Sequence, residues 1–272
     1  MENLIYDVGA HLGEDSQHYL AKGFKVVAVE ANPDLVSHLR NRFSTEIADG
    51  RLKLVECIIS EETGYQTFYV NETTTVWGTA YPQWATRNAR LGSKSREIRL
   101  PTRPFAEIMK EFGVPYYLKI DVEGADMLCV EALRSFDKRP QYVSIESEKI
   151  SWKRLLHEFD ELEQLGYRNF KVIDQASVHT HHPRVRGVEG NGATFVYEPG
   201  SSGLFGRDLP GRWLTRSEAL LKYRLIFLRY YLFGDDGKIN DWFITKILRR
   251  IPILRQIART VWYDTHACLA QT

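Results

Sequence analysis

Hydrophobic residues in this chain form short runs that alternate with longer stretches of helical periodicity. The runs lie at residues 4–10, 25–31, 52–59, 116–122 and 141–146. Short, continuously apolar runs are typical of strands that are buried on both faces of a sheet. The amphipathic stretches between them predict helices at residues 14–22, 34–46, 125–136 and 153–165. This alternation predicts βαβ units and a mostly parallel sheet covered by helices.

Two further apolar runs lie at residues 169–174 and 193–198. Because the loop between them is too short for a crossover helix, we expect these strands to pair antiparallel at the end of the sheet. Residues 61–103 interrupt the alternation with a Thr-rich loop that carries Trp77. Insertions of this kind often contact a substrate, so Trp77 is a candidate substrate contact.

The composition changes at residues 199–211, which are rich in Gly, Pro and Ser. We therefore predict a main domain over residues 1–199 and a basic, aromatic-rich helical extension over residues 200–272. The extension contains 12 Lys and Arg against 6 Asp and Glu, a net charge of +6, whereas residues 1–199 contain 24 against 29, a net charge of −5. Its aromatic and aliphatic residues at helical spacing predict packing onto the main domain or a second copy, with attachment to a membrane surface as the alternative.

The net charge of the whole chain is +1, and 43% of its 272 residues are hydrophobic. This composition is that of a globular protein with a full core, and it provides no overall field that attracts nucleic acid. Cys57, Cys129 and Cys268 lack the spacing of a disulfide framework or a zinc site. Neither a signal peptide nor an apolar run of about 18 residues is present, so we expect a cytoplasmic protein, at most peripheral to a membrane.

The first predicted strand runs into the sequence DVGAHLGED, in which Gly9 and Gly13 flank a turn. Glycine in such a turn lets the backbone approach a ligand closely. The spacing differs from the dinucleotide-binding pattern, because His11 stands where a second glycine is usual. The acidic Glu14 and Asp15 at the helix start would repel a pyrophosphate. These features favour a ligand without phosphates.

The second predicted strand ends in Glu30, 23 residues after Asp7. A carboxylate at this place can accept hydrogen bonds from both hydroxyls of a ribose, although it can also simply cap the end of the strand. With the glycine turn, Glu30 indicates an adenosine site. S-adenosylmethionine suits an acidic pocket better than NAD or ATP, because it has a positive sulfonium and no phosphate.

The fourth predicted strand carries the string YYLKIDVEGAD, which places Lys119, Asp121 and Glu123 on one face of a buried strand. They either form an internal ion pair between Lys119 and Asp121 or stand beside a ligand at the carboxyl edge of the sheet, where α/β enzymes keep their catalytic groups. The fifth strand ends similarly, with Glu146 and Glu148. The sequence alone does not decide between the internal ion pair and the position beside a ligand.

The strings DVGAHLG, VAVEANP, KIDVEGAD and SIES together resemble the FkbM family of S-adenosylmethionine-dependent methyltransferases. The resemblance covers residues 4–198. It implies the class I, Rossmann-like methyltransferase fold, whose mostly parallel seven-stranded sheet has an antiparallel last strand. Asp126 departs from the family, which usually has Glu at this position.

The resemblance also implies roles for individual residues. The implied contacts to S-adenosylmethionine are Asp7, Gly9, Ala10, His11, Gly13, Glu30, Ala31, Asn32, Cys57, Ile58 and Asp121. In the implied site Glu30 binds the ribose, and Cys57 and Ile58 line the adenine. For catalysis we predict Asp121 or Glu123 as the base or acceptor-orienting group, Glu146 in support, and Lys119 as counter-charge.

Family members methylate hydroxyl groups of sugars and secondary metabolites, so the resemblance implies O-methyl transfer to a small-molecule or glycan acceptor. Two alternatives remain: a nucleic-acid methyltransferase, against which the acidic body argues, and a cofactor-binding scaffold subunit without turnover.

The histidines suggest a second kind of chemistry. The cluster HTHHP at residues 179–183 and the pair Asp264 and His266 are candidates for holding a divalent ion. We expect the loop histidines to be solvated. Asp264 and His266, in a predicted terminal helix, are candidates for the acceptor site, and whether a metal takes part stays open.

Overall fold

The structure is a computed structural model that describes residues 3–122, 124–148, 151–175, 178, 187–192, 197–198, 200–233 and 261–270. The described residues form two compact units. The first unit takes its residues from 1–145 and 178–210, and the second from 146–177 and 211–272.

The first unit is built on parallel strands in the order β3-β2-β1-β7-β8. Their bounds are β1 Leu4–Val8, β2 Lys25–Glu30, β3 Leu52–Glu56, β7 Tyr117–Ile120 and β8 Tyr142–Glu146. Strands β1, β2 and β7 are buried almost throughout, as their continuous apolar runs predicted. The chain leaves β1 in one direction toward β2 and returns on its other side as β7, so ligand-binding loops of an α/β sheet are expected at this reversal.

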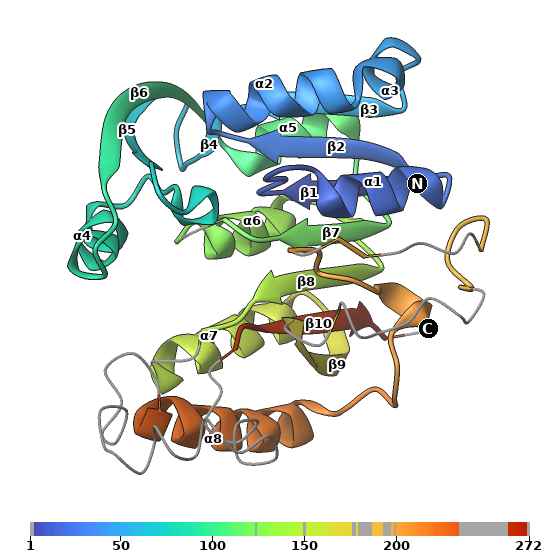
Figure 1. Cartoon of the computed structure of the whole chain (residues 1–272). Coiled ribbons are helices and arrows are strands. Elements are labelled where there is room, and N and C mark those ends of the chain that lie inside the picture. The colour runs from blue at the N-terminus through green and yellow to red at the C-terminus, as the bar shows by residue number, and fades with distance from the viewer. Residues whose placement is uncertain are drawn as a thin grey trace. The chain divides into compact units, whose positions relative to one another are not determined.

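Helices cover both faces of these strands, α1 and α2 on one face and α5 and α6 on the other (Figure 1). Their bounds are α1 Glu14–Ala21, α2 Pro33–Arg42, α3 Ser44–Ala48, α5 Phe105–Phe112, α6 Asp126–Ala132 and the 3₁₀ turn η2 Leu133–Ser135. Helix α2 begins with an N-cap, in which the Asn32 side chain accepts a hydrogen bond of 3.0 Å from the backbone N–H of Asp34, and Pro33 occupies the first turn.

The insertion forms a small three-stranded sheet with the order β4-β6-β5. Its elements are β4 Ile58–Ile59, β5 Gly64–Asn71, η1 Thr75–Trp77, α4 Pro82–Arg90 and β6 Ser95–Arg103. The predicted strand over residues 52–59 is therefore divided, since β3 ends at Glu56 and Ile58 and Ile59 pair with β6. Ile58, Phe68, Val70 and Ala80 make the small apolar core of this insertion.

The second unit contains α7 Trp152–Gln164, β9 Tyr167–Asp174, α8 Arg216–Phe233 and β10 Tyr263–Leu269. Strands β9 and β10 pair antiparallel. The predicted strand over residues 193–198 does not include Tyr197 and Glu198, which belong to no strand. Residues 193–196 lie outside the described residues, so their pairing with β9 stays a prediction. The prediction of a terminal helix around Asp264 and His266 is wrong, because both lie on β10.

The cause of this error is that the pattern within one segment cannot identify a strand partner nearly 90 residues away. Residues 263–269 include Tyr263 and Thr265 two positions apart, residue types that are common in strands. Five parallel strands and one antiparallel pair nevertheless make up the seven strands of the large-sheet topology. The predicted mostly parallel α/β class with an antiparallel end is confirmed.

Residues 200–210, which begin the predicted extension, pack into the first unit. Phe205 is fully buried and stacks on Tyr117 with ring centroids 4.7 Å apart. Asp208, in the 3₁₀ turn η4 Gly206–Asp208, makes a buried ion pair of 2.5 Å with Lys22. The division of the chain at residue 199 stays a prediction about domain organisation.

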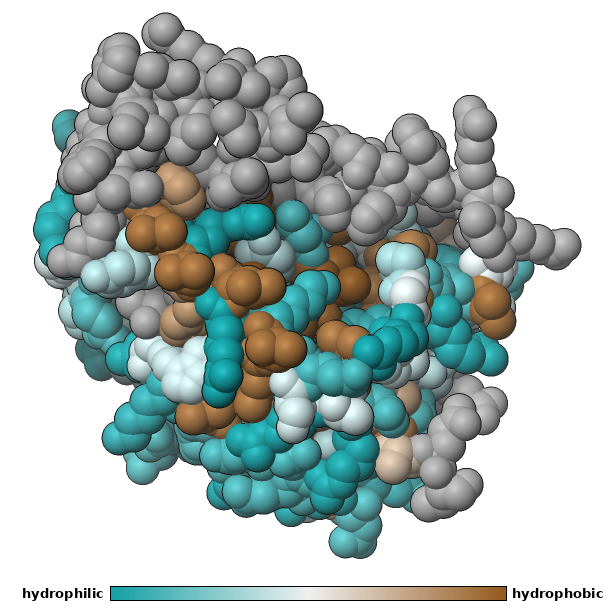
Figure 2. All heavy atoms as spheres, turned by 90° about the horizontal axis from the view of Figure 1, so that it is seen from below, coloured by the Kyte–Doolittle hydropathy of each residue, from teal (hydrophilic) through white to brown (hydrophobic). Residues whose placement is uncertain are grey.

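Helix α8 exposes a row of large hydrophobic side chains in addition to its buried face. Leu221, Leu225, Leu228 and Tyr231 are each more than half exposed. Figure 2, which views the side on which α8 lies, shows hydrophobic side chains gathered there. Within the described part of the chain, no helix has the length and hydropathy needed to cross a bilayer.

Candidate functional site

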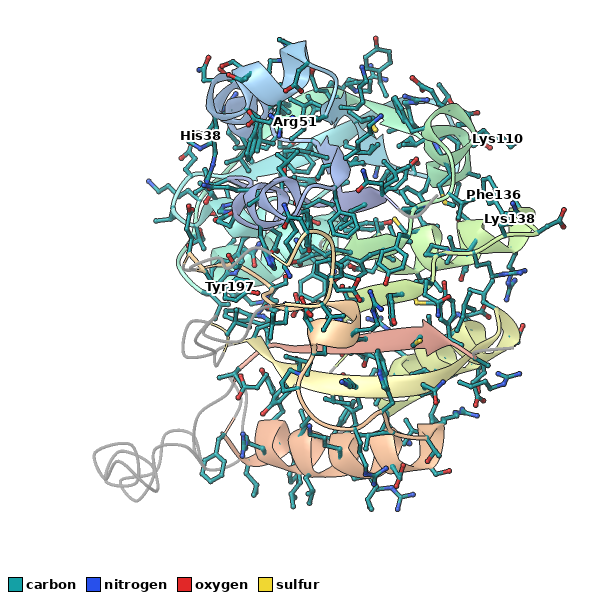
Figure 3. The ribbon with its side chains drawn as sticks, turned by 90° about the vertical axis from the view of Figure 1, so that its right-hand side faces the viewer. His38, Arg51, Lys110, Phe136, Lys138 and Tyr197 are labelled. Carbon is teal, nitrogen blue, oxygen red and sulfur yellow. The ribbon has the colours of Figure 1, made fainter. Side chains whose placement is uncertain are left out.

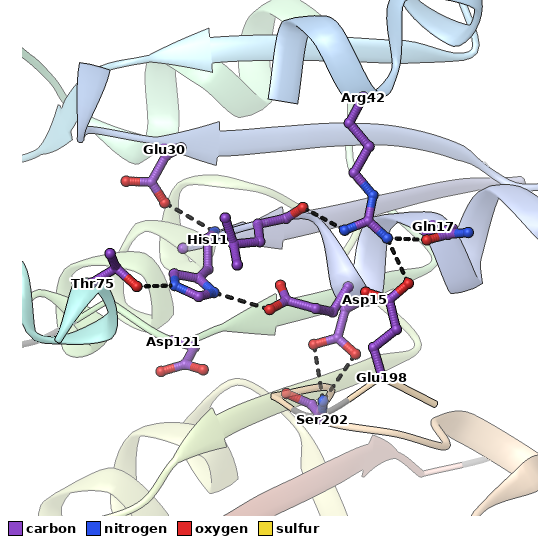
Figure 4. Close-up of polar contacts among 12 residues, drawn as sticks. His11, Asp15, Gln17, Glu30, Arg42, Thr75, Asp121, Glu198 and Ser202 are labelled. Atoms are coloured by element: carbon purple, nitrogen blue, oxygen red, sulfur yellow. Dashed lines mark hydrogen bonds and ion pairs between the residues drawn. The ribbon is translucent and has the colours of Figure 1, made fainter. Parts of the chain in front are cut away.

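A pocket opens at the carboxyl ends of β1, β2 and β7, between their loops and the insertion (Figure 4). Its empty space is about 740 Å³, open solvent at the mouth included. Eight of the predicted cofactor contacts line it. These are Gly9, His11, Glu30, Ala31, Asn32, Cys57, Ile58 and Asp121.

The loop after β1 passes unusually close to the loop after β7. Gly9 has φ of 82°, and a Cβ atom there would lie 1.9 Å from the carbonyl oxygen of Asp121. Only glycine permits this approach together with this backbone conformation. Gly9 therefore brings the first loop and Asp121 to one wall of the pocket.

Glu30 lies at the end of β2 and turns its carboxylate toward backbone N–H groups. Oε1 accepts from Ala31 at 2.9 Å and Asn32 at 2.8 Å, and Oε2 accepts from His11 at 3.0 Å. Burial raises the pKa of Glu30, and these N–H groups oppose that rise. The capping interpretation of Glu30 is thus correct as a description of its contacts. A carboxylate offers about four acceptor sites, so one remains for a ligand in the pocket that it lines.

His11 joins three parts of the site. Its ring nitrogens lie 3.1 Å from Glu14 Oε1 and 2.8 Å from Thr75 Oγ1, and its backbone has φ of 51°. Burial raises the pKa of Glu14, but the hydrogen bonds from His11 and from the backbone outweigh it, so the net pKa is lowered. Through Thr75, His11 connects the β1 loop to the insertion. The sequence placed His11 in the turn but gave no sign of this contact.

Lys119 is buried among three carboxylates, and its Nζ lies 3.2 Å from Asp7, 3.4 Å from Asp15 and 3.7 Å from Asp121. Burial alone would lower the pKa of Lys119, but the acids raise it well above its ordinary value, so the amine is charged. Asp7 also accepts a hydrogen bond of 2.6 Å from Ser16. The predicted ion pair between Lys119 and Asp121 exists, and Asp121 also lines the pocket.

Asp15 is a residue whose role the sequence did not reveal. Both of its carboxylate oxygens accept from the backbone N–H of Ser202, at 2.9 and 3.0 Å. Burial raises the pKa of Asp15 to about 6, with Lys119 opposing and Asp7 adding to the rise. Figure 4 shows this contact beside a second one, in which Arg42 donates to Glu198. These two contacts tie residues 198 and 202 to helices α2 and α1.

The same segment is anchored further from the pocket by Tyr197, which is labelled in Figure 3. Its ring packs edge-on against that of His18, with centroids 4.8 Å apart. Its hydroxyl lies 3.3 Å from His18 Nε2. Burial lowers the pKa of His18 to about 3, so this contact involves a neutral imidazole.

Part of the pocket lining is apolar. Cys57, Ile58 and Phe68 contribute to it together with Leu35 from α2. Burial raises the pKa of the Cys57 thiol to about 12, so the sulfur is protonated and presents a soft, uncharged surface. This surface suits a flat heterocycle such as adenine.

Several predicted residues do not line the pocket. Asp7, Ala10 and Lys119 are buried behind it, and Gly13 packs under Phe43, whose ring a Cβ atom would meet at 2.4 Å. Trp77 and Glu146 are also absent from its lining, and Glu123 lies outside the described residues.

Asp264 and His266 belong to the second unit, whereas every pocket residue belongs to the first. Asp264 accepts a hydrogen bond of 2.5 Å from Gln175, and burial lowers the pKa of His266 to about 3. Among the described residues, no group of three or more His, Cys, Asp or Glu is placed to hold a metal ion. Residues 179–183 lie outside that part of the chain.

A family model described as the methyltransferase FkbM domain matches residues 7–171, more than half of the chain. The chain belongs to the FkbM methyltransferase family. This FkbM protein is therefore a methyltransferase, and S-adenosylmethionine, which the sequence predicted, is its cofactor. The pocket fits that cofactor, since it combines a strand-end carboxylate with an apolar wall.

Other similar proteins are more distant from this FkbM methyltransferase. A probable ribosomal RNA small subunit methyltransferase A of Haloarcula marismortui is 40% identical over 52 residues, which are 19% of this chain and 18% of that protein. A precorrin-6y C5,15-methyltransferase of Geobacter metallireducens aligns with 10% identity over 99% of this chain and 80% of that one, with a TM-score of 0.40. An S-adenosylmethionine-dependent methyltransferase of Archaeoglobus fulgidus aligns with 9% identity over 98% and 86%, with a TM-score of 0.39.

Proposed function

We propose that this methyltransferase acts on a hydroxyl group of a sugar, a glycan or a secondary metabolite. The observation that carries the proposal is the state of Asp121. Its side chain is 37% exposed and lines the pocket, and among the described residues its polar contact is the 3.7 Å ion pair with Lys119. A carboxylate in this position can orient an acceptor hydroxyl and receive its proton.

S-adenosylmethionine supplies a methyl group on a positively charged sulfur when it is bound. Glu30 would hold the ribose with its remaining acceptor site, and Cys57 and Ile58 would face the adenine. Asp121 would stand near the reacting groups. Lys119, at 3.7 Å, holds the Asp121 carboxylate in place through their ion pair. Positioning of the acceptor supplies much of the acceleration in such transfers.

Calorimetric titration with S-adenosylmethionine and S-adenosylhomocysteine tests the cofactor site. Glu30→Ala should weaken both by at least about tenfold, because the ribose contact is lost. Glu56→Ala is the matched control, since Glu56 is the register partner of Glu30 at the end of β3 and does not line the pocket. Equal weakening in both variants would contradict the role given to Glu30.

Formation of S-adenosylhomocysteine with a panel of hydroxylated acceptors tests the reaction. Sugars, glycans and polyketide alcohols form the panel, and an RNA oligonucleotide tests the nucleic-acid alternative. Asp121→Asn should lower kcat while leaving the affinity for the cofactor unchanged. Unaltered turnover in this variant would remove Asp121 from the mechanism, and turnover on RNA alone would overturn the proposed acceptor class.

A further inference from the structure

The insertion carries a cation between two indole rings. The Arg87 guanidinium carbon lies 5.8 Å from the ring centroid of Trp77 and 5.1 Å from that of Trp84. All three side chains are partly exposed. The side-chain N–H of Asn88 donates a hydrogen bond of 3.1 Å to the backbone carbonyl of Trp77, which ties the backbone at Trp77 to helix α4. The rings are thus held in place while part of their surface faces solvent.

This group adjoins the pocket at the loop that follows Asp121. A Cβ atom on Gly124 would lie 2.9 Å from Tyr81 Cδ2 and 3.0 Å from Trp84 Nε1, so the loop lies directly against both rings. Tyr81 itself lines the pocket. A molecule that reaches Asp121 past this loop would meet the aromatic surface.

The charge of this part of the insertion differs from that of the main body. Residues 82–103 contain 6 Lys and Arg and 1 Asp or Glu, a net charge of +5, whereas residues 1–199 as a whole carry −5. Arg96 and Arg103 form ion pairs with Asp34 and Glu111. Arg87 is distinguished by its place between aromatic faces beside the pocket. A guanidinium there can bind a carboxylate or phosphate, while an indole face packs against the C–H face of a ring.

We propose that Trp77, Tyr81, Trp84 and Arg87 form the acceptor subsite, and that it takes a sugar ring bearing an anionic group. The aromatic faces hold the ring, and Arg87 pairs with its carboxylate or phosphate. This inference rests on the proposed function, since it names the substrate class for the same site. It also assigns Trp77, which lies outside the pocket lining, a contact with the part of the acceptor furthest from Asp121.

Indole N–H signals of ¹⁵N-Trp-labelled protein, saturated with S-adenosylhomocysteine, provide the direct test. The chain has six Trp residues, and Trp77→Phe and Trp84→Phe assign the two relevant signals. Glucuronate, glucose 1-phosphate and glucose are titrated to millimolar concentrations. The anionic sugars should shift both signals saturably, with apparent Kd at least about tenfold lower than for glucose, while the signals of Trp152 and Trp213 in the second unit stay unchanged. A comparison of glucuronate with glucose 1-phosphate shows whether the subsite prefers a carboxylate or a phosphate.

Arg87→Gln should raise the apparent Kd for the anionic sugars at least about tenfold and leave the response to glucose unchanged. Arg90→Gln, an exposed arginine on the same helix, is the matched control and should alter neither. Unmoved Trp77 and Trp84 signals, equal responses to glucose and the anionic sugars, or a wild-type response in Arg87→Gln would each overturn the inference.

Calorimetry with S-adenosylmethionine on the same samples separates the two proposals. Cofactor binding without any sugar response refutes the subsite and leaves the methyltransferase site intact. Cofactor binding that is unchanged in Arg87→Gln, together with the loss of the anionic response, supports the subsite.

Discussion

Replacing Lys119 with Met removes the only positive side chain that the described residues place within 4 Å of Asp7 and Asp15. Both carboxylates are almost completely buried. Charges 3.2 to 3.4 Å apart attract by about 5 kcal/mol per pair at an effective dielectric constant of 20. The cost of burying Lys119 offsets much of this attraction. Breaking a buried pair by removing one partner costs about 3–5 kcal/mol, so we expect Lys119→Met to lose that amount of unfolding free energy.

This loss is large against a typical stability of about 5–15 kcal/mol. Urea unfolding, followed by far-UV circular dichroism at pH 7.5, measures it. Arg40→Met is the control, because Arg40 pairs with Glu56 at the surface and its loss should cost no more than about 1 kcal/mol. Adding Asp15→Asn to Lys119→Met should recover part of the loss, since it removes one of the stranded charges.

The pH dependence provides an independent check on the cause. Burial raises the folded-state pKa of Asp15 above its unfolded value, and without Lys119 no positive charge opposes this rise. The folded state then binds more protons than the unfolded state, so stability falls as the pH rises through this range. The loss of unfolding free energy in Lys119→Met relative to wild type should therefore be smaller at pH 5 than at pH 8. A loss below about 1 kcal/mol, or one that is independent of pH, would refute the electrostatic reasoning.

Three further predictions concern the surroundings of the pocket. Gly9→Ala should lower the midpoint of thermal unfolding by more than Gly50→Ala. Both glycines have positive φ, but of the two only Gly9 would place a Cβ atom against another atom, the Asp121 carbonyl oxygen at 1.9 Å. Equal decreases in the two variants would contradict this reason. Burial raises the pKa of Asp15 from 3.8 to about 6, so this group makes the wild-type free energy of unfolding fall as the pH rises from about 4 to 6. Asp15→Asn should flatten this part of the plot of unfolding free energy against pH, measured by urea titrations at successive pH values. Phe205→Ala should cost about 3–5 kcal/mol of unfolding free energy, and a cost near zero would show that residues 200–210 do not stabilise the first unit.

The sequence by itself determined the elements whose signals are local. Continuous apolar runs identified β1, β2 and β7, and Asn32 with Pro33 marked the start of α2. Because parallel strands end at the same edge of a sheet, the strand-end acids Glu30 and Asp121 could be predicted to share a site, and both line the pocket. The motif strings also predicted the family correctly.

Tertiary structure decided which distant segments meet. Residues 263–269, for which the sequence predicted a helix, form the strand that pairs with β9, and Ser202 reaches Asp15 across 187 positions of the chain. The contact of His11 with Thr75 likewise joins a turn to an insertion 64 residues later. The periodicity of apolar residues indicates whether a strand or helix buries one face or two. Which distant segment it contacts depends on the path of the whole chain. The buried strands of the first unit and the strand-end acids could therefore be predicted locally, whereas the strand at residues 263–269, its partner β9 and the contacts that position Lys119 and His11 could not.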